Sequence, residues 1–381
     1  MGPLGILGGG QLGRMTLQAA SRLGIDVVIA ERAPDSPAAR LTDRGIVFSN
    51  GWDDAAALDK LAEATRVITL ESEFVDWRVL ESLERRGARV LPAPACVRVV
   101  QDKLFQKQAL ACAELPVPQF RDVPDATALV HAARDLGWPL MLKARRDGYD
   151  GRGNVVVRSA SDAETASQKL GPPERALFAE AFVEFERELA CLVVRAQAGG
   201  VVIYPVVETR QDPRLHICRE VLAPADLPLD VTTRAASIAR AAVEAVDGVG
   251  AFGVEMFQTS DGQLLINELA PRPHNSAHYT IEACWTSQFE NHARAVLGLP
   301  LGDTGLRAPA AAMINLLGSG TSALGNESLA DALADHSRVF VHLYGKSENR
   351  VGRKMGHVTA LGEKLDEALG AARATADRIR L

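Results

Sequence analysis

The sequence has no long apolar run and very little cysteine. None of its apolar stretches approaches the roughly 18 residues that a membrane-spanning helix requires. The 5 cysteines lie far apart and form no CxxC pair, which argues against a disulfide framework and against a cysteine-rich zinc site. No basic residue precedes the first apolar stretch, so a secretory signal is not expected. These absences predict a cytoplasmic protein with reduced thiols and no membrane association.

Basic residues, 42 in number, are fewer than the 48 acidic ones. The formal net charge is −6, which argues against non-specific binding of nucleic acid. The hydrophobic share of 47% and the charged share of 24% are ordinary for a soluble globular protein, and they exclude collagen-like, low-complexity and mostly disordered classes. A chain of 381 residues is expected to form two or three domains.

The first 93 residues alternate short apolar runs with helical patterns. This β-α-β alternation predicts a parallel sheet with crossover helices. The expected strands are 5–7, 27–29, 67–70 and 90–91, with a helix over 12–23. Pro92 and Pro94 mark the predicted end of this region.

The remainder of the chain predicts an α+β pattern with antiparallel hairpins. Between 94 and 303, the expected helices are 99–115 and 126–136, and the expected strands are 140–143, 155–157, 176–182, 188–196, 201–207, 253–257 and 264–269. From 304 onward, a small third unit is predicted, with strands over 310–316, 339–344 and 356–360 and a helix over 363–380.

A glycine motif, GGGQLG, follows the first expected strand and opens the first expected helix. Its spacing from Gly8 to Gly13 matches GxGxxG, and Glu31 ends the next strand, where the ribose-binding acid of a dinucleotide site would lie. The motif alone leaves two interpretations open. The glycines can bind a pyrophosphate at the helix N-terminus, or they can simply let helix and strand pack closely.

A second glycine-rich loop, residues 148–154, joins two expected strands and follows Lys143. Its backbone N–H groups could fold over a polyphosphate while the lysine supplies a point charge. The loop is not a Walker A motif, because no Gly-Lys-Ser/Thr follows and no helix begins there. The alternative is an ordinary hairpin tip, and the phosphate lid is favoured.

Two glutamates are predicted to face each other across a hairpin. Asp261-Gly262 is a strong two-residue turn signal, and that register places Glu255 directly opposite Glu268. Opposed carboxylates have Cβ atoms about 5 Å apart and destabilise a sheet unless a cation lies between them. Oxygen ligands on rigid strands suit Mg²⁺. The alternative is a solvated pair on an exposed face. Strict alternation would place Asn267 on the opposite face.

Polar residues follow this hairpin at once. Arg272, His274, Asn275 and Ser276 place a guanidinium, an imidazole, an amide and a hydroxyl beside the proposed metal, which suits an anionic, oxygen-rich substrate. His278 next to them could instead cap the following helix.

Several motifs in this order resemble the N5-carboxyaminoimidazole ribonucleotide synthetases, which are ATP-grasp ligases of purine biosynthesis. The motifs are GGGQLGRM, QDK, GYDGRGN, ERELA, GVEMF and NELAPRPHNSAHYTIEACWTSQFE. The resemblance implies an ATP-grasp fold over 94–303, a Rossmann-like pre-ATP-grasp domain over 1–93 that binds no NAD, and a small β-rich domain over 304–381. It also implies ATP, Mg²⁺ and bicarbonate as reactants or cofactors, and a homodimer.

The resemblance also implies a nucleotide site and a metal site. Lys103 and Lys143 would contact the phosphates under the glycine-rich lid, residues 180–183 would form the adenine hinge, and Glu188 would hold the ribose. The implied nucleotide-binding residues are Lys103, Lys143, Gly148, Tyr149, Asp150, Gly151, Arg152, Gly153, Asn154, Glu180, Ala181, Phe182, Val183, Glu188, Gln211, Asn267 and Glu268. The implied metal ligands are Glu255, Glu268 and Asn267.

A ribonucleotide site is implied beside it. Its residues would be Gln11, Glu73, Tyr149, Asp150, Arg152, Arg272, His274, Asn275, Ser276, Lys346 and Arg353, of which the last two would receive the 5′-phosphate. Arg272 would stabilise carboxyphosphate and Lys143 would offset phosphate charge, while Asp150 and His274 would handle the amine proton.

The expected reaction is the carboxylation of 5-aminoimidazole ribonucleotide with ATP and bicarbonate. Three alternatives stay open. The first is another ATP-grasp ligase, such as a formate-dependent transformylase or a biotin carboxylase. The second is a nucleotide-binding regulatory protein without turnover. The third is an NAD-dependent dehydrogenase, which depends on the glycine motif alone.

Overall fold

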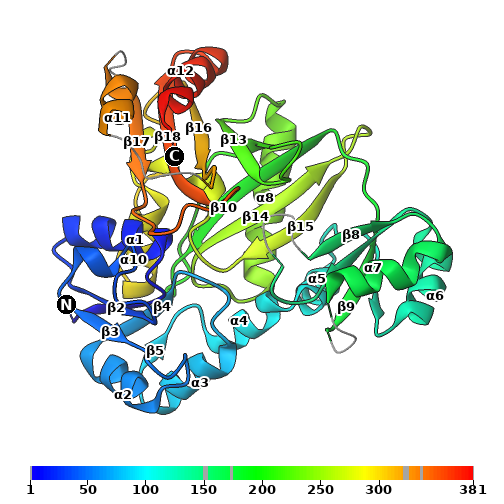
Figure 1. Cartoon of the computed structure of the whole chain (residues 1–381), viewed down its shortest axis with the longest axis horizontal. Helices are drawn as coiled ribbons and strands as arrows, with labels where there is room; N and C mark the ends of the chain where they lie inside the picture. Colours follow the sequence, from blue (N-terminus) through cyan, green and yellow to red (C-terminus); the bar gives the residue numbers. More distant parts are fainter. Residues whose placement is uncertain (1, 149–152, 172–174, 321–325, 335–337, 381) are drawn as a thin grey trace.

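The computed structural model describes residues 2–148, 153–171, 175–320, 326–334 and 338–380. Their helices and strands form three sheets with helices packed against them (Figure 1). The N-terminal sheet and a four-stranded sheet lie towards opposite ends of the long axis, and the largest sheet lies between and above them. Within these residues, no helix combines the length and apolar character needed to cross a membrane.

The N-terminal sheet is parallel, as the alternation predicted, with strand order β3-β2-β1-β4-β5. Its strands are β1 (Leu4–Leu7), β2 (Val27–Glu31), β3 (Gly45–Val47), β4 (Val67–Leu70) and β5 (Arg89–Val90). Its helices are α1 (Gln11–Arg22), α2 (Ala55–Ala64) and α3 (Trp77–Arg85), with a short turn η1 (Ala39–Leu41). The central strands β1 and β4 are buried along their whole length, because apolar clusters cover both faces of the sheet.

The single helix expected over 99–115 is wrong. The chain forms two helices, α4 (Pro94–Gln101) and α5 (Lys103–Cys112), which meet at Asp102. The Asp102 carboxylate accepts hydrogen bonds from the backbone N–H groups of Leu104 (3.0 Å) and Phe105 (3.3 Å), and this N-cap begins a new helix. Arg145 holds the same carboxylate at 2.7 Å.

The four-stranded sheet is antiparallel, in the order β6-β9-β7-β8. Its strands are β6 (Phe120–Val123), β7 (Leu140–Ala144), β8 (Asn154–Val157) and β9 (Leu177–Ala181). The helices α6 (Ala126–Leu136) and α7 (Ala163–Leu170), with the short turn η2 (Ala160–Asp162), pack against it through a shared apolar cluster. The predicted helix over 126–136 is confirmed.

The largest sheet has the order β15-β14-β10-β12-β13-β16-β18-β17, with β11 paired to β10. Its strands are β10 (Arg187–Arg195), β11 (Val201–Ile203), β12 (Val207–Gln211), β13 (Cys218–Ala223), β14 (Gly250–Gln258), β15 (Leu264–Ala270), β16 (Ala310–Leu317), β17 (Val339–Leu343) and β18 (Lys354–Gly362). Its helices are α8 (Leu229–Ala245), α9 (Thr280–Ala283), α10 (Gln288–Leu297), α11 (Asn326–Leu333) and α12 (Leu365–Arg378), with the turn η3 (Asn275–Ala277).

Two features of this sheet differ from expectation. The segment 201–207 is not one strand, because Pro205 has no N–H to donate and separates β11 from β12. The strands of the expected third unit are confirmed, but they continue the central sheet, since β13 pairs with β16 and β16 with β18. The division into domains at 93/94 and 303/304 therefore stays a prediction.

Candidate active site

A cavity of about 650 Å³ is lined by residues of the four-stranded sheet and the largest sheet, together with α1 and the loop that follows β4. Most of the predicted site residues line it. They are Gln11, Glu73, Lys103, Lys143, Gly148, Asn154, Glu180, Ala181, Phe182, Val183, Glu188, Gln211, Glu255, Asn267, Glu268, Arg272, His274, Asn275 and Ser276.

The predicted carboxylate pair is confirmed, although the register forms differently. Glu255 and Glu268 are direct cross-strand partners between β14 and β15. The hairpin loop holds three residues instead of two, because Thr259 pairs with Gln263 and Gly262 adopts a φ of 79°. One extra residue in β15 restores the pairing, since the register shifts between Glu255 and Met256.

That extra residue is Asn267, which bulges out of the ladder. The expectation that it faces away from the glutamates is wrong. Its Nδ2 donates to Glu255 Oε2 at 3.4 Å, and its Oδ1 accepts from Lys143 Nζ at 3.3 Å. A bulged residue has no cross-strand partner and its side chain is re-aimed. The bulge therefore places an amide oxygen beside the two carboxylates.

The pKa values of the two glutamates are shifted in opposite directions. Burial, followed by the neighbouring Glu268, raises the pKa of Glu255 well above its usual range. Burial opposes ionisation of Glu268 too, but the ammonium of Lys103 contacts its carboxylate and lowers its pKa below the usual range. Two carboxylates and an amide oxygen on adjacent strands are hard donors that suit Mg²⁺. Among the described residues no group of three or more His, Cys, Asp and Glu has metal-binding geometry, so further donors would come from ligand oxygens.

The two predicted phosphate-binding lysines approach the cavity from different elements. Lys103 begins α5, and Lys143 lies near the end of β7. The Lys143 ammonium lies 2.5 Å from Glu180 in β9. Burial would raise the pKa of Glu180, but Lys107 and Lys143 outweigh it and lower the pKa to about 2.

A second charge pair lies in the loop that follows β15 and the loop that follows β4. Arg272 donates from Nη2 to Glu73 Oε1 at 2.7 Å and from Nε to the other carboxylate oxygen. This bidentate geometry is the strong form of the interaction. Burial opposes ionisation of Glu73, yet the adjacent guanidinium lowers its pKa overall.

His274 is held as a neutral imidazole. Burial, reinforced by Arg272 and Lys354, lowers its pKa to about 3. Its Nδ1 lies 2.8 Å from Ser276 Oγ, and its Nε2 lies 3.5 Å from Glu255. Its backbone N–H and C=O both bond to the Gln288 side chain in α10, which fixes the loop. Asn275 exchanges two amide hydrogen bonds with Asn315 in β16.

The backbone N–H groups of the first glycine motif bond to two carboxylates of the same chain. Gly9 N–H donates to Glu31 at 2.8 Å, and the N–H groups of Leu12 and Gly13 donate to Glu71 at 3.1 and 3.0 Å. These amides are the ones that a pyrophosphate would need at the start of α1. The dehydrogenase alternative, with Glu31 as a ribose ligand, is therefore wrong.

Some predicted residues lie elsewhere. Gly153 does not line the cavity, and neither do Lys346 and Arg353, which donate to the backbone carbonyls of Lys354 and Glu348. The predictions for Tyr149, Asp150, Gly151 and Arg152 fall outside the described residues. Gln211 does meet Glu188, because its Nε2 donates to that carboxylate.

Sequence reasoning missed several residues at the cavity. Lys354 and His278 line it, as do Phe185 and Phe257, whose rings stack with their centroids 4.6 Å apart. Lys107, which contacts Glu180, was also missed. One signal for it was present, because Lys107 lies four residues after Lys103 and so shares a face of the same helix.

Comparison with known proteins agrees with this geometry. Residues 1–101 match the ribonucleotide synthetase preATP-grasp domain, 108–289 the ATP-grasp domain, and 311–371 the phosphoribosylaminoimidazole carboxylase C-terminal domain. The chain is 44% identical over 356 residues to the N5-carboxyaminoimidazole ribonucleotide synthase of Synechococcus elongatus, covering 93% of this chain and 88% of the relative. The chain belongs to the N5-carboxyaminoimidazole ribonucleotide synthase family.

Other members of this synthase family extend the comparison. The chain is 42% identical over 373 residues to the phosphoribosylaminoimidazole carboxylase of Schizosaccharomyces pombe, covering 96% of this chain but 66% of that longer relative. The crystal structure of the Aspergillus clavatus synthase in complex with ADP and 5-aminoimidazole ribonucleotide has 35% identity and a TM-score of 0.88, covering 99% of this chain and 98% of that one. Family and domain together make the chain an ATP-dependent ligase.

Proposed function

We propose that this protein uses ATP and bicarbonate to carboxylate the amine of 5-aminoimidazole ribonucleotide, with release of ADP and phosphate. One observation carries the proposal. The paired carboxylates Glu255 and Glu268, two lysines and Arg272 all line one cavity, which is the arrangement that a phosphoryl transfer next to an anionic substrate requires.

The reaction divides into two balanced steps. A bicarbonate oxygen attacks the γ-phosphorus of ATP, the bond to the β-phosphate oxygen breaks, and carboxyphosphate and ADP form. The substrate amine then bonds to the carboxyl carbon, phosphate leaves, and the amine loses one proton. Phosphoryl transfer asks little covalent work of a protein, so positioning and charge compensation should supply most of the acceleration.

Each role falls to residues at the cavity. Lys103 and Lys143 offset phosphate charge. Arg272, whose Nε and Nη2 hold Glu73, binds the carboxyphosphate oxygens through its remaining N–H groups. His274 lines the same cavity and takes the amine proton in this proposal; burial and the nearby Arg272 and Lys354 lower its pKa, so bound phosphate must first offset those cations. Mg²⁺, held by Glu255, Glu268 and Asn267, would supply further charge compensation on the phosphates.

The remaining parts of the proposal follow the family resemblance. The nucleotide lies between the hinge 180–183 and the lid 148–154, with Glu188 and Gln211 near its ribose. Gln11 and Glu73 contact the ribonucleotide, and Lys346 and Arg353 receive its 5′-phosphate. We also propose a cytoplasmic homodimer, which sedimentation equilibrium of the purified protein tests for oligomeric state.

The test is a coupled ADP-release assay with reactants omitted in turn. ADP should form rapidly only when ATP, bicarbonate and 5-aminoimidazole ribonucleotide are all present, and the carboxylated amine should be detected in equal amount. ADP release that responds to formate or biotin instead would assign another ATP-grasp ligase. Nucleotide binding without turnover would favour the regulatory alternative.

A further inference from the structure

Three side chains on one face of helix α5 contact β15. Lys103, Gln106 and Lys107 follow the i, i+3, i+4 spacing that puts residues on one side of a helix. Lys103 contacts Glu268 directly. Gln106 accepts from Leu269 N–H at 2.8 Å and donates to Leu269 C=O at 3.0 Å.

Lys107 bonds to the backbone of β15 on the other side of the bulge. Its Nζ donates to the Ile266 carbonyl at 2.8 Å, so Gln106 and Lys107 hold the backbone on both sides of Asn267 and Glu268. Both side chains are fully buried, with 1% exposure each. A single helix, α5, therefore fixes the backbone on both sides of the bulge at the proposed metal site.

The same ammonium reaches the other sheet. Lys107 Nζ lies 2.9 Å from Glu180 Oε1 in β9, while Lys143 holds the second oxygen of that carboxylate. Lys107 thus joins the strand of the hinge to the strand of the metal ligands. The nucleotide is proposed to lie against the first of these strands, and its metal ion against the second.

Lys107, Lys143 and Glu180 form a buried group with two basic side chains and one acidic side chain. Two lysines share one carboxylate, and their side chains are 2%, 9% and 3% exposed for Lys107, Lys143 and Glu180. Burying charges costs more than apolar packing would, so stability alone does not account for the cluster. Because Lys107 faces Glu180 and Lys143 lines the cavity, the surplus positive charge is available at Lys143.

We propose that Lys107 is a positioning residue for nucleotide binding: it shares Glu180 with Lys143, and by offsetting the charge of that carboxylate it leaves Lys143 with positive charge for the ATP phosphates. Lys107 does not line the cavity itself. The proposal deepens the function proposed above and rests on its nucleotide site. It is separable from that function, because ADP affinity is measurable whether or not carboxylation occurs.

The test begins with Lys107→Met, which keeps the stem and removes the charge. Glu180 then pairs with Lys143 alone and draws it from the phosphates. We expect the KM for ATP and the Kd for ADP, measured by calorimetry, to rise about tenfold, the size of one charge-assisted hydrogen bond, while the KM for 5-aminoimidazole ribonucleotide changes little. Lys169→Met, at an exposed position on α7, is the matched control and should leave both values unchanged.

A second substitution separates positioning from packing. In the Lys107→Met background, Glu180→Gln removes the carboxylate that holds Lys143, so affinity for ADP should recover at least in part. A further loss of affinity would mean that Lys107 has only a structural role and would overturn the proposal. Unchanged affinity in Lys107→Met would overturn it too. If the Met variant fails to fold, Lys107→Gln keeps a donor for Ile266 without the charge and carries the same expectations.

Discussion

Asn267 contacts Glu255 because β15 holds one residue more than β14 between Glu268 and Ile266. The bulge sets which side chains face the cavity. A strand without it would keep Glu268 in place only if the hairpin loop also lost a residue, and Asn267 would then face away. Geometry at the proposed metal site therefore depends on a backbone irregularity as much as on the acidic residues.

Removing either carboxylate should disable turnover. Glu255→Gln and Glu268→Gln are each expected to lower kcat by about a hundredfold, because transition-state charge on the phosphates loses compensation. The measurement is ADP release against Mg²⁺ concentration. Glu63→Gln on the exposed side of α2 serves as the control. Wild-type rates in both variants at saturating Mg²⁺ would contradict the assignment.

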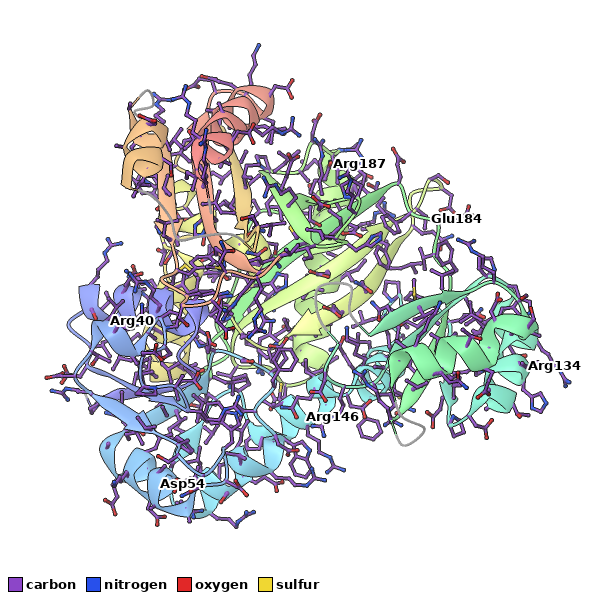
Figure 2. The ribbon with its side chains drawn as sticks, viewed as in Figure 1. Arg40, Asp54, Arg134, Arg146, Glu184 and Arg187 are labelled. Atoms are coloured by element: carbon purple, nitrogen blue, oxygen red, sulfur yellow. The ribbon has the colours of Figure 1, made fainter. Side chains whose placement is uncertain are left out.

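Arg272 and Glu73 should be energetically coupled. Arg272→Met leaves a mostly buried carboxylate without its partner, and we expect the free energy of unfolding to fall by about 1–3 kcal/mol, with kcat falling as well. Urea unfolding of Arg272→Met, Glu73→Gln and the double variant measures the coupling. Arg134→Met, at the surface on α6 (Figure 2), is the control. Additive losses would show that the pair contributes no interaction energy.

His292 should make the fold sensitive to acid. It joins β4 to β14, accepting from Ala251 N–H at Nδ1 (3.0 Å) and contacting Thr69 at Nε2 (3.0 Å). Burial lowers its pKa to about 4. A histidine in the unfolded chain has a pKa of about 6.5. Between roughly pH 6.5 and pH 4, the unfolded state therefore binds a proton that the folded state does not, and the free energy of unfolding falls as the pH drops.

Urea unfolding at pH 7 and pH 5 checks this expectation. The wild-type protein should lose about 1–2 kcal/mol more than His292→Gln between the two pH values, because only the wild type has this proton to take up on unfolding. Other buried histidines contribute equally to both proteins and cancel. Identical pH dependence would mean that His292 does not titrate as inferred.

Gly10 should not tolerate a side chain. A Cβ there would lie 2.4 Å from Glu71 Oε1, whose carboxylate holds the start of α1. We expect Gly10→Ala to lower the free energy of unfolding by about 1–3 kcal/mol. Gly370→Ala in α12 meets no atom within 4 Å and should be neutral or stabilising by about 0.5–1 kcal/mol. Thermal unfolding of both variants gives the comparison, and equal stability would contradict the close approach of Glu71.

Much of this architecture could be predicted from local patterns. The parallel N-terminal sheet followed from apolar runs. The opposition of Glu255 and Glu268 was predicted correctly but from a two-residue turn that does not form, and it holds because a bulge in β15 offsets the longer loop. The bulge at Asn267 could not, because it depends on how α5 packs against β15 and not on the residues of β15 themselves. The helix break at Asp102 was missed for a related reason, since its carboxylate is also held by Arg145, which follows β7 and is distant in the chain.

The site was predicted best where its residues adjoin one another in sequence. Arg272, His274, Asn275 and Ser276 occupy one loop and reach one cavity. Lys107 was harder to find, because its role depends on Ile266 and Glu180, which are distant in the chain and meet only in the fold. The glycine motif gave a wrong prediction. Its spacing is typical of a cofactor site, yet the backbone N–H groups that would bind the cofactor donate to Glu71 instead.

The pairing of β13 with β16 also bears on how the chain can be shortened. Residues 220–223 of β13 bond to 311–314 of β16, so a truncation after 303 would strip one whole side of β13 of its partner. Bare strand edges invite pairing with other molecules. The C-terminal segment thus covers a strand edge that would otherwise be open to non-native pairing, and excising it should yield aggregates instead of a smaller working ligase.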